Sequence, residues 1–190
     1  GYHKVFLSNS GTEAVECAYK LAKWHSRKRW TIAFENAFHG RTMGSLSMTK
    51  SKSVQRERFG PFLPVKHVKY PNVYRMGEDC ASECLHDLER TIRKTKDIAS
   101  IFIEPIQGEG GYIVPPRAFI KGVRKLCNEH SILLCDDEVQ SGCFRTGTFL
   151  AIENFGVKPN IISMSKAIGG GIPLGATIST KEIMDWPKGA

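Results

Sequence analysis

The stretch IASIFIEPIQGEGGYIVPPRAFIKGVRKLCNEHSILLCDDE, residues 98–138, places a helical pattern between two apolar runs. The segments 98–106 and 131–138 each contain a nearly continuous apolar run, IASIFI and ILLC, which is typical of strands buried on both faces of a parallel sheet. The segment 115–130 between them begins with two prolines, and proline suits the first turn of a helix. This order of strand, helix and strand predicts an α/β sheet whose faces are covered by helices.

The same alternation continues on both sides of this stretch. Further strands are expected at 4–9, 31–35, 160–166 and 175–180, and further helices at 12–28, 41–49, 80–95 and 147–156. Residues 50–78 contain several prolines and glycines and are expected to form a long loop. We therefore predict a three-layer α/β fold: a mostly parallel, doubly wound sheet with helices on both faces.

The composition limits the class of protein. With 190 residues, 41% of them hydrophobic and 24% charged, the chain is long enough for one globular domain with a full core. No apolar run approaches the roughly 18 residues that a membrane span needs, and we expect no membrane partner. The net charge of +8 is expected to reflect a basic surface or an excess balanced by acidic parts outside this chain, and attraction to phosphorylated or acidic ligands is the alternative. The basic residues are scattered without a recognition motif, so no nucleic-acid partner is expected.

The six cysteines form no CxxC pair, and together with six scattered histidines they predict no zinc site or other metal site. Cysteines at apolar positions are typical of a reducing compartment, so a cytoplasmic location is expected. The first residues lack a signal-peptide pattern, and the last residues lack a helix-ending pattern. We expect the chain to be a piece of a longer one.

Polar motifs follow the predicted strands. They are SNSGTEA, ENAFHGR, EPIQGEGG, DDEVQSG and SKAIGGG. Ligands of parallel α/β sheets bind beyond the carboxyl ends of the strands. We therefore expect these motifs to converge on one edge of the sheet and to form an active site there.

Ser10, Gly11 and Thr12 lie between a predicted strand and a helix. Backbone N–H groups at a helix N-terminus bind phosphate, and glycine lets the phosphate come close. The alternative is that Ser10 or Thr12 only caps the helix. The GxxxxGK[ST] pattern is absent, so a P-loop nucleotide site is not supported.

Asp136 and Asp137 end an apolar strand. A carboxylate at the end of a buried strand is costly unless it has a cationic or hydrogen-bonding partner, and a protonated pyridine nitrogen would be one. The alternative is an acid in a loop that is solvated or caps a turn. The spacing leaves open which of the two aspartates is the functional one.

Lys166 lies between an apolar strand and the glycines at 169–171. A desolvated lysine loses its proton more readily and forms Schiff bases, and the glycines leave room for a flat ligand. The alternative is a lysine that only flanks a turn. The SxxK pattern of penicillin-recognising enzymes is rejected because no SDN or KTG motif accompanies it.

Phe38 and His39 follow the end of another predicted strand, where an aromatic ring can stack on a flat heterocycle. The alternative places Phe38 in the core and makes His39 a hydrogen-bonding loop residue. Glu104, Gln107 and Glu109 lie within six residues beside a third strand end. Acids in such loops are usually solvated, but three polar groups so close together suggest a site.

From Ser8 to about Thr180, the chain resembles the class III (omega) aminotransferases, enzymes of fold type I that depend on pyridoxal 5′-phosphate. The segments that carry the resemblance are SGTEAVECAYKLA, FHGRTMGSLSMT, IEPIQGEGG, LLCDDEVQSGCFRTG and SKAIGGGIPLGA, in the family's order. The resemblance implies that residues 1–190 are the central part of the large, cofactor-binding domain. An N-terminal segment and a C-terminal small domain would lie outside this chain.

The resemblance also implies roles for residues. Lys166 is similar to the lysine that holds the cofactor and later moves protons, and Asp137 to the aspartate that pairs with the pyridine nitrogen. Glu109 resembles the glutamate that pairs with an arginine or swings aside for α-carboxylates, and Glu104 is expected to support the site from behind. The other expected cofactor contacts are Ser10, Gly11, Thr12, Phe38, His39, Val139 and Gln140.

By the same resemblance, the expected activity is transfer of an amino group from an (omega-)amino acid or amine, such as 4-aminobutyrate or ornithine, to a 2-oxo acid. The region around FHGRT is more similar to 4-aminobutyrate aminotransferases than to acetylornithine aminotransferases. A homodimer with the site at its interface is implied. The alternatives are a racemase or aminomutase on the same scaffold, and a non-catalytic fragment that keeps the fold.

Overall fold

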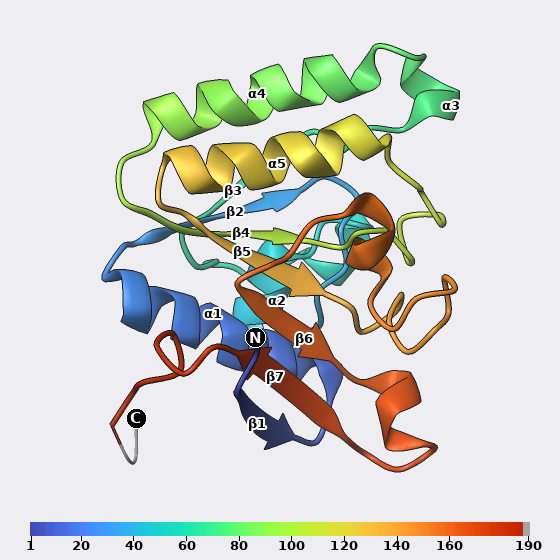
Figure 1. The fold of residues 1–190 in the computed structure, drawn as a ribbon. Helices are drawn as coiled ribbons and strands as arrows, with labels where there is room; N and C mark the ends of the chain where they lie inside the picture. The colour runs from blue at the N-terminus through green and yellow to red at the C-terminus, as the bar shows by residue number, and fades with distance from the viewer. Residues whose placement is uncertain (188–190) are drawn as a thin grey trace.

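The computed structural model describes residues 1–187, which contain one seven-stranded sheet in the order β1-β7-β6-β5-β4-β2-β3 (Figure 1). The strands are β1 Lys4–Ser8, β2 Trp30–Phe34, β3 Val65–Val68, β4 Ile98–Ile103, β5 Leu133–Asp137, β6 Ile161–Met164 and β7 Gly175–Ser179. Strands β3, β2, β4, β5 and β6 pair in parallel, whereas β7 is antiparallel to both β6 and β1. The predicted, mostly parallel sheet is confirmed.

Helices cover both faces of this sheet. The α-helices are α1 Gly11–Ser26, α2 Met43–Met48, α3 Val73–Met76, α4 Cys80–Lys94 and α5 Arg117–Glu129, and the 3₁₀ helices are η1 Ser53–Gln55, η2 Ala151–Phe155 and η3 Lys166–Gly169. Helix α1 lies on one face, while α4 and α5 lie together on the other (Figure 1). The predicted three-layer α/β architecture is therefore confirmed.

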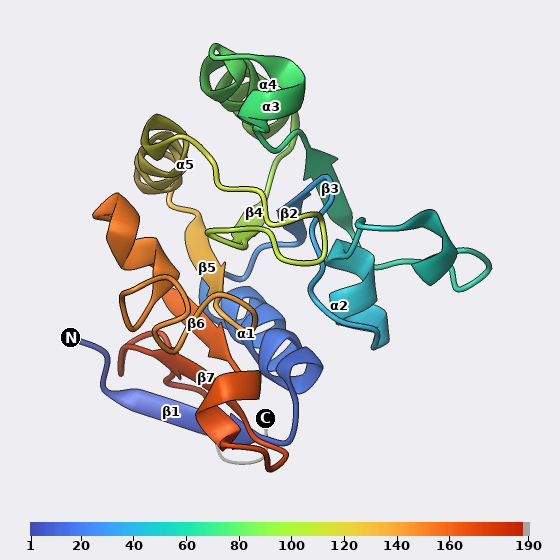
Figure 2. The same ribbon diagram turned by 90° about the vertical axis from the view of Figure 1, so that its right-hand side faces the viewer.

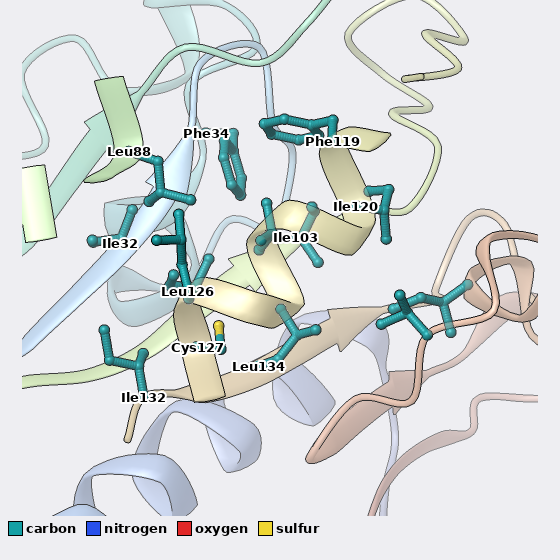
Figure 3. Packing of buried hydrophobic residues seen from close by; sticks show 14 of the residues in the cluster. Ile32, Phe34, Leu88, Ile103, Phe119, Ile120, Leu126, Cys127, Ile132 and Leu134 are labelled. Atoms are coloured by element: carbon teal, nitrogen blue, oxygen red, sulfur yellow. The ribbon is translucent and has the colours of Figure 1, made fainter. Parts of the chain in front are cut away.

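The core has two halves, one on each face of the sheet. In the half under α4 and α5, Phe34, Ile103 and Phe119 are fully buried (Figure 3). In the half under α1, Leu21 and Phe102 are fully buried. Neighbouring residues of one strand thus enter opposite halves, which explains why β4 is a continuous apolar run.

The predicted loop 50–78 is partly wrong. It contains η1, the short edge strand β3 and the one-turn helix α3. Strand β3 pairs in parallel with β2 at the edge of the sheet, and only Val68 of its four residues is fully buried. Four residues flanked by prolines give too short a pattern for sequence reasoning to separate from a loop.

Several other expected elements are shorter than predicted. The helix expected at 147–156 is the 3₁₀ helix η2, which Gly156 ends in a left-handed conformation. The strand expected at 160–166 stops at Met164, so the residues that follow turn out of the sheet. The pairing of β7 with β6 is antiparallel because the short connection between them has no room for a crossover helix.

Two successive antiparallel pairings give β1 the same direction as β6. The carboxyl ends of β1, β2, β4, β5 and β6 therefore meet at one edge of the sheet, which faces the viewer in Figure 2. Each of the polar motifs follows one of these strands. The fold thus gathers residues that are up to about 150 positions apart in the sequence.

Candidate active site

A cavity of about 600 Å³ opens at this edge, a size that suits a small organic ligand. All five polar motifs contribute to its wall. The predicted site residues that line it are Gly11, Thr12, Phe38, His39, Glu104, Glu109, Asp137, Val139, Gln140 and Lys166, and Ser10 is not among the lining residues. The expected convergence of the motifs is what the fold shows.

The N-terminus of α1 forms one wall of the cavity. Ser10 caps the helix, since its Oγ accepts from the Glu13 N–H at 3.3 Å, and this is the alternative role considered for Ser10. Gly11 and Thr12 begin the helix, so their N–H groups lack acceptors within it and lie at the positive end of the helix dipole. A Cβ on Gly11 would come within 2.7 Å of Val139 Cγ1, so this close packing requires glycine. The wall is suited to an anionic group such as a phosphate.

Asp137 ends β5 and is held on both of its oxygens. Its Oδ1 accepts from the Val139 N–H at 3.1 Å, and its Oδ2 lies 2.7 Å from Nδ1 of His39. His39 is fully buried, and its Nε2 has no hydrogen-bond partner within residues 1–187. Burial opposes protonation of His39, but the hydrogen bond and the charge of Asp137 outweigh it, so the pKa of His39 is raised. The pair places a fixed negative group on the cavity wall.

The two aspartates of the DDE motif lie on opposite faces of β5. Asp137 lines the cavity, whereas Asp136 is buried elsewhere and neither of its oxygens has a partner within the described residues. Burial, together with Glu138 and Asp137, raises the pKa of Asp136 well above its usual value. Of the two aspartates, Asp137 is therefore the one that can touch a ligand in this cavity.

Lys166 begins η3 directly after β6 and donates through Nζ to Oε1 of Gln140. Its φ of 47° is left-handed, a strained conformation for a non-glycine residue that is common at functional sites. Its side chain lines the cavity but is exposed, so the desolvation considered for Lys166 is not found within the described residues. Within the described residues, the Lys166 side chain is therefore accessible to water.

Glu104 connects two loops of the site. Its Oε2 accepts from the Phe38 N–H at 3.0 Å and its Oε1 from the Gly108 N–H at 3.2 Å. Burial raises the pKa of Glu104 to about 7. The charge of His39 acts in the opposite direction, and the charge of Asp137 adds to the rise. Glu104 therefore holds the loop with Phe38 beside the loop with Gly108.

Phe38 is half-buried and belongs to neither half of the core, so the alternative that placed it in the core is not supported. Gly108 lies so close to Gln140 that a Cβ would come within 2.4 Å of its Cγ. Glu109 forms an ion pair with Lys52, with 2.7 Å between Oε1 and Nζ.

Several residues at the site were not predicted. Thr12 Oγ1 contacts the hydroxyls of Thr42 at 2.8 Å and Ser45 at 2.6 Å, which ties α1 to α2. Arg41 and Tyr112 line the cavity as well. Arg41 and Thr42 continue the FHG motif, which could have indicated them, whereas Lys52 lies in the segment predicted to be a loop and carries no motif.

Within residues 1–187, no group of three or more His, Cys, Asp or Glu side chains is arranged to hold a metal ion. No helix of this part of the chain is long and apolar enough to cross a membrane. The site is thus defined by a lysine, an aspartate–histidine pair and a helix N-terminus on the walls of one cavity in an α/β fold.

This class of site agrees with the comparisons with known proteins. The sequence profile of the aminotransferase class-III family matches residues 1–189. Over 184 residues the chain is 45% identical to acetylornithine aminotransferase from Methanopyrus kandleri. This alignment covers 96% of the present chain and 43% of the relative. The chain belongs to the class III aminotransferase family, and it spans less than half the length of this relative.

Solved structures of transaminases share the fold. An amine transaminase from an uncultivated Pseudomonas species, in its PLP-bound form, superposes with a TM-score of 0.92 at 32% identity, covering 97% of this chain and 45% of that one. Taurine:2-oxoglutarate aminotransferase from Bifidobacterium kashiwanohense, in complex with PLP and glutamate, has a TM-score of 0.91 at 31% identity, covering 97% and 44%. The fold is that of fold-type I transaminases.

Proposed function

We propose that this chain is the cofactor-binding part of a pyridoxal 5′-phosphate-dependent aminotransferase that moves an amino group from an amino acid or amine to a 2-oxo acid. One observation carries the proposal: Lys166, the Asp137–His39 pair and the N-terminus of α1 face the same cavity. The relatives support it, since they include an acetylornithine aminotransferase and a PLP-bound amine transaminase.

The residues present fit this cofactor. The free N–H groups at the start of α1, with the close approach allowed by Gly11, would hold its phosphate. The carboxylate of Asp137 would bind its protonated ring nitrogen, and Phe38 and Val139 would contact the two faces of the ring. When bound, pyridoxal phosphate supplies an electron sink for the carbanion left when the amine-bearing carbon loses a proton.

Different residues of the chain would bind the cofactor, transfer protons and position the site. Lys166 Nζ, positioned by Gln140, would bind the cofactor and then carry a proton to and from the carbon that bears the amine. His39 would donate to Asp137 and keep its carboxylate ionised and oriented towards the ring nitrogen. Glu104 would keep Phe38 in place, and Glu109 would face the substrate.

The substrate and the assembly belong to the same proposal. The FHGRT region favours 4-aminobutyrate as the donor, while the relative from Methanopyrus kandleri acts on acetylornithine by its name, so an ω-amino acid such as 4-aminobutyrate or an ornithine derivative is proposed. Lys166 is exposed on a cavity open to solvent, which supports a homodimer whose second subunit closes the site. A cytoplasmic location is part of the proposal.

The test uses the full-length protein and its Lys166→Ala variant, each incubated with pyridoxal phosphate. We expect an absorbance band near the violet edge of the visible spectrum in the unchanged protein, and none in the variant. After borohydride reduction, mass spectrometry should place the cofactor's added mass on the peptide that contains Lys166. Labelling of other lysines, or no band in either protein, would contradict the proposal and leave a scaffold that binds no cofactor.

A further inference from the structure

A cavity of about 400 Å³ lies at the edge of the sheet opposite to the cofactor cavity. Its wall is formed by the ends of α1 and α5 and by the start of β5, all of which lie towards the left in Figure 1. Leu133 begins β5 and lines this cavity, whereas Asp137 ends β5 and lines the cofactor cavity. The two residues are four positions apart in one strand, a separation of about 13 Å, so the two cavities are separate sites.

The polar groups on the wall of this second cavity are cationic or neutral. Within residues 1–187, its lining includes His25, Lys28 and Arg124 but no aspartate or glutamate. None of these three side chains forms an ion pair with another described residue. Asn128 and Ser131 also line the cavity, and their side chains can donate hydrogen bonds. A wall of this composition attracts anions, because the positive charge is not offset by a carboxylate among the lining residues.

Arg124 is held in place by neutral partners. Its Nη1 donates to Oδ1 of Asn160 at 2.7 Å, and its Nη2 donates to Oδ1 of Asn128 at 2.6 Å. Its Nε is buried and has no hydrogen-bond partner within the described residues. These hydrogen bonds orient the guanidinium without neutralising it, because amide oxygens carry no net charge. A planar guanidinium in a fixed orientation is well suited to bind the oxygens of a phosphate group.

Lys28 brings a second cation to the same wall. Its Nζ donates to the backbone oxygen of Ser131 at 2.8 Å, which connects the end of α1 to the turn that follows α5. This contact uses one of the three N–H groups of the ammonium, so two remain for a ligand. Lys28 also lies near the negative end of the α1 dipole, which it stabilises. Its structural contact therefore leaves Lys28 able to bind an anion.

We propose that this cavity binds the phosphate group of a small molecule, with Lys28 and Arg124 as its ligands. A phosphate group carries up to about two negative charges at neutral pH, which two cations on one wall can share. The volume admits either inorganic phosphate or a small phosphate monoester. The inference does not depend on the proposed transamination, since no residue lines both this cavity and the cofactor cavity.

The first test measures binding by calorimetry to full-length protein saturated with pyridoxal phosphate. Inorganic phosphate and glycerol 3-phosphate are titrated separately at constant ionic strength, and the probe that binds more tightly identifies the ligand as the free ion or a monoester. Lys28→Met should weaken binding of that probe about tenfold, because a charge-assisted hydrogen bond is lost, and Lys28→Arg should restore most of it. The matched control is Lys20→Met, which removes the same charge from an exposed position of α1 outside the cavity and should change Kd by less than about twofold.

The second test locates the anion in the unchanged protein. Crystals of the full-length protein are soaked in tungstate, a phosphate analogue whose anomalous scattering reveals its position. The expected peak lies between Lys28 Nζ and the Arg124 guanidinium. Tungstate peaks only outside the cavity, no binding of either phosphate probe, or equal losses of affinity in Lys28→Met and Lys20→Met would overturn the proposal.

Discussion

The two faces of β5 place an aspartate side chain in different surroundings, with different hydrogen-bond partners. Asp137, on the cavity face, has partners on both oxygens, while its neighbour Asp136, on the core face, has none within the described residues. Side chains of a strand alternate between faces, so adjacent residues of one type enter different environments. The difference shows that partners and access, rather than residue type, decide which carboxylate can serve a ligand.

The largest expected effect comes from substituting each aspartate in turn. Asp137→Asn should lower kcat at least about a hundredfold, because the ring nitrogen of the proposed cofactor would lose its charged partner. Asp136→Asn should change kcat by less than about threefold, since Asp136 does not line the cavity. Steady-state kinetics of the full-length protein measures kcat for both variants. Similar losses of kcat in the two variants would contradict the proposed difference between the two faces of β5.

A second prediction concerns stability and pH. The folded pKa of Asp136 lies well above its unfolded value because the residue is buried and lies beside the carboxyl groups of Glu138 and Asp137. Its contribution to stability is therefore full below the unfolded pKa of about 4 and is lost as pH rises towards the folded pKa. At pH 8 Asp136→Asn should be more stable than the unchanged protein by about 1–3 kcal/mol, and this advantage should shrink towards pH 4.

Urea denaturation at pH 5 and pH 8 measures this difference in the free energy of unfolding. The matched control is Asp79→Asn, which changes an exposed aspartate and should stay within about 0.5 kcal/mol at both pH values. A loss of stability in Asp136→Asn at pH 8 would show that Asp136 has a partner that offsets its burial.

A third prediction tests His39, which forms a hydrogen bond with Asp137 and none with Asp136. His39→Asn should weaken the affinity for pyridoxal phosphate about tenfold, because the buried carboxylate loses a charge-assisted hydrogen bond. The raised pKa of His39 means that its protonated form stabilises the fold below about pH 6.5, and that this gain is lost as pH rises through the folded pKa. Fluorescence titration with the cofactor measures the affinity, and an unchanged affinity would remove His39 from the site.

The smallest effect is expected at Glu104, whose carboxylate holds two loops of the cavity wall and has no proposed contact with the cofactor. With a pKa of about 7, Glu104 loses its charge as pH falls through neutrality, and its hydrogen bonds to the Phe38 and Gly108 N–H groups weaken. Cofactor affinity should therefore fall about two- to threefold between pH 8 and pH 6. Glu104→Gln should abolish this inflection, and a persistent inflection would assign it to another group.

Much of the fold was predictable because its signals are local. The continuous apolar runs at β4 and β5 predicted strands buried on both faces, and the prolines before α5 predicted where that helix begins. Strand β3 was missed, since four residues at an edge of the sheet carry too little pattern. The antiparallel placement of β1 and β7 depends on pairing between distant segments, which no local pattern reports.

The site shows the same division. The resemblance to the class III aminotransferases implied that Lys166 and Asp137 carry the chemistry. The motifs predicted that several loops meet at one edge of the sheet. They did not predict the ion pair of Lys52 with Glu109, because the partners are 57 positions apart and Lys52 carries no motif. They also left Ser10 with two roles, and the hydrogen bond to Glu13 shows it as a helix cap.

The sequence by itself determined the α/β class, the order of the elements outside residues 50–78 and the residue types at the carboxyl ends of the strands, because burial and backbone preferences act over a few neighbouring residues. Only the tertiary structure decided which face of β5 each aspartate occupies, that Lys166 is exposed rather than buried, and which cation holds Glu109. These outcomes depend on contacts between segments far apart in the chain, and the free energy of a charged group is set by whichever groups those contacts place beside it.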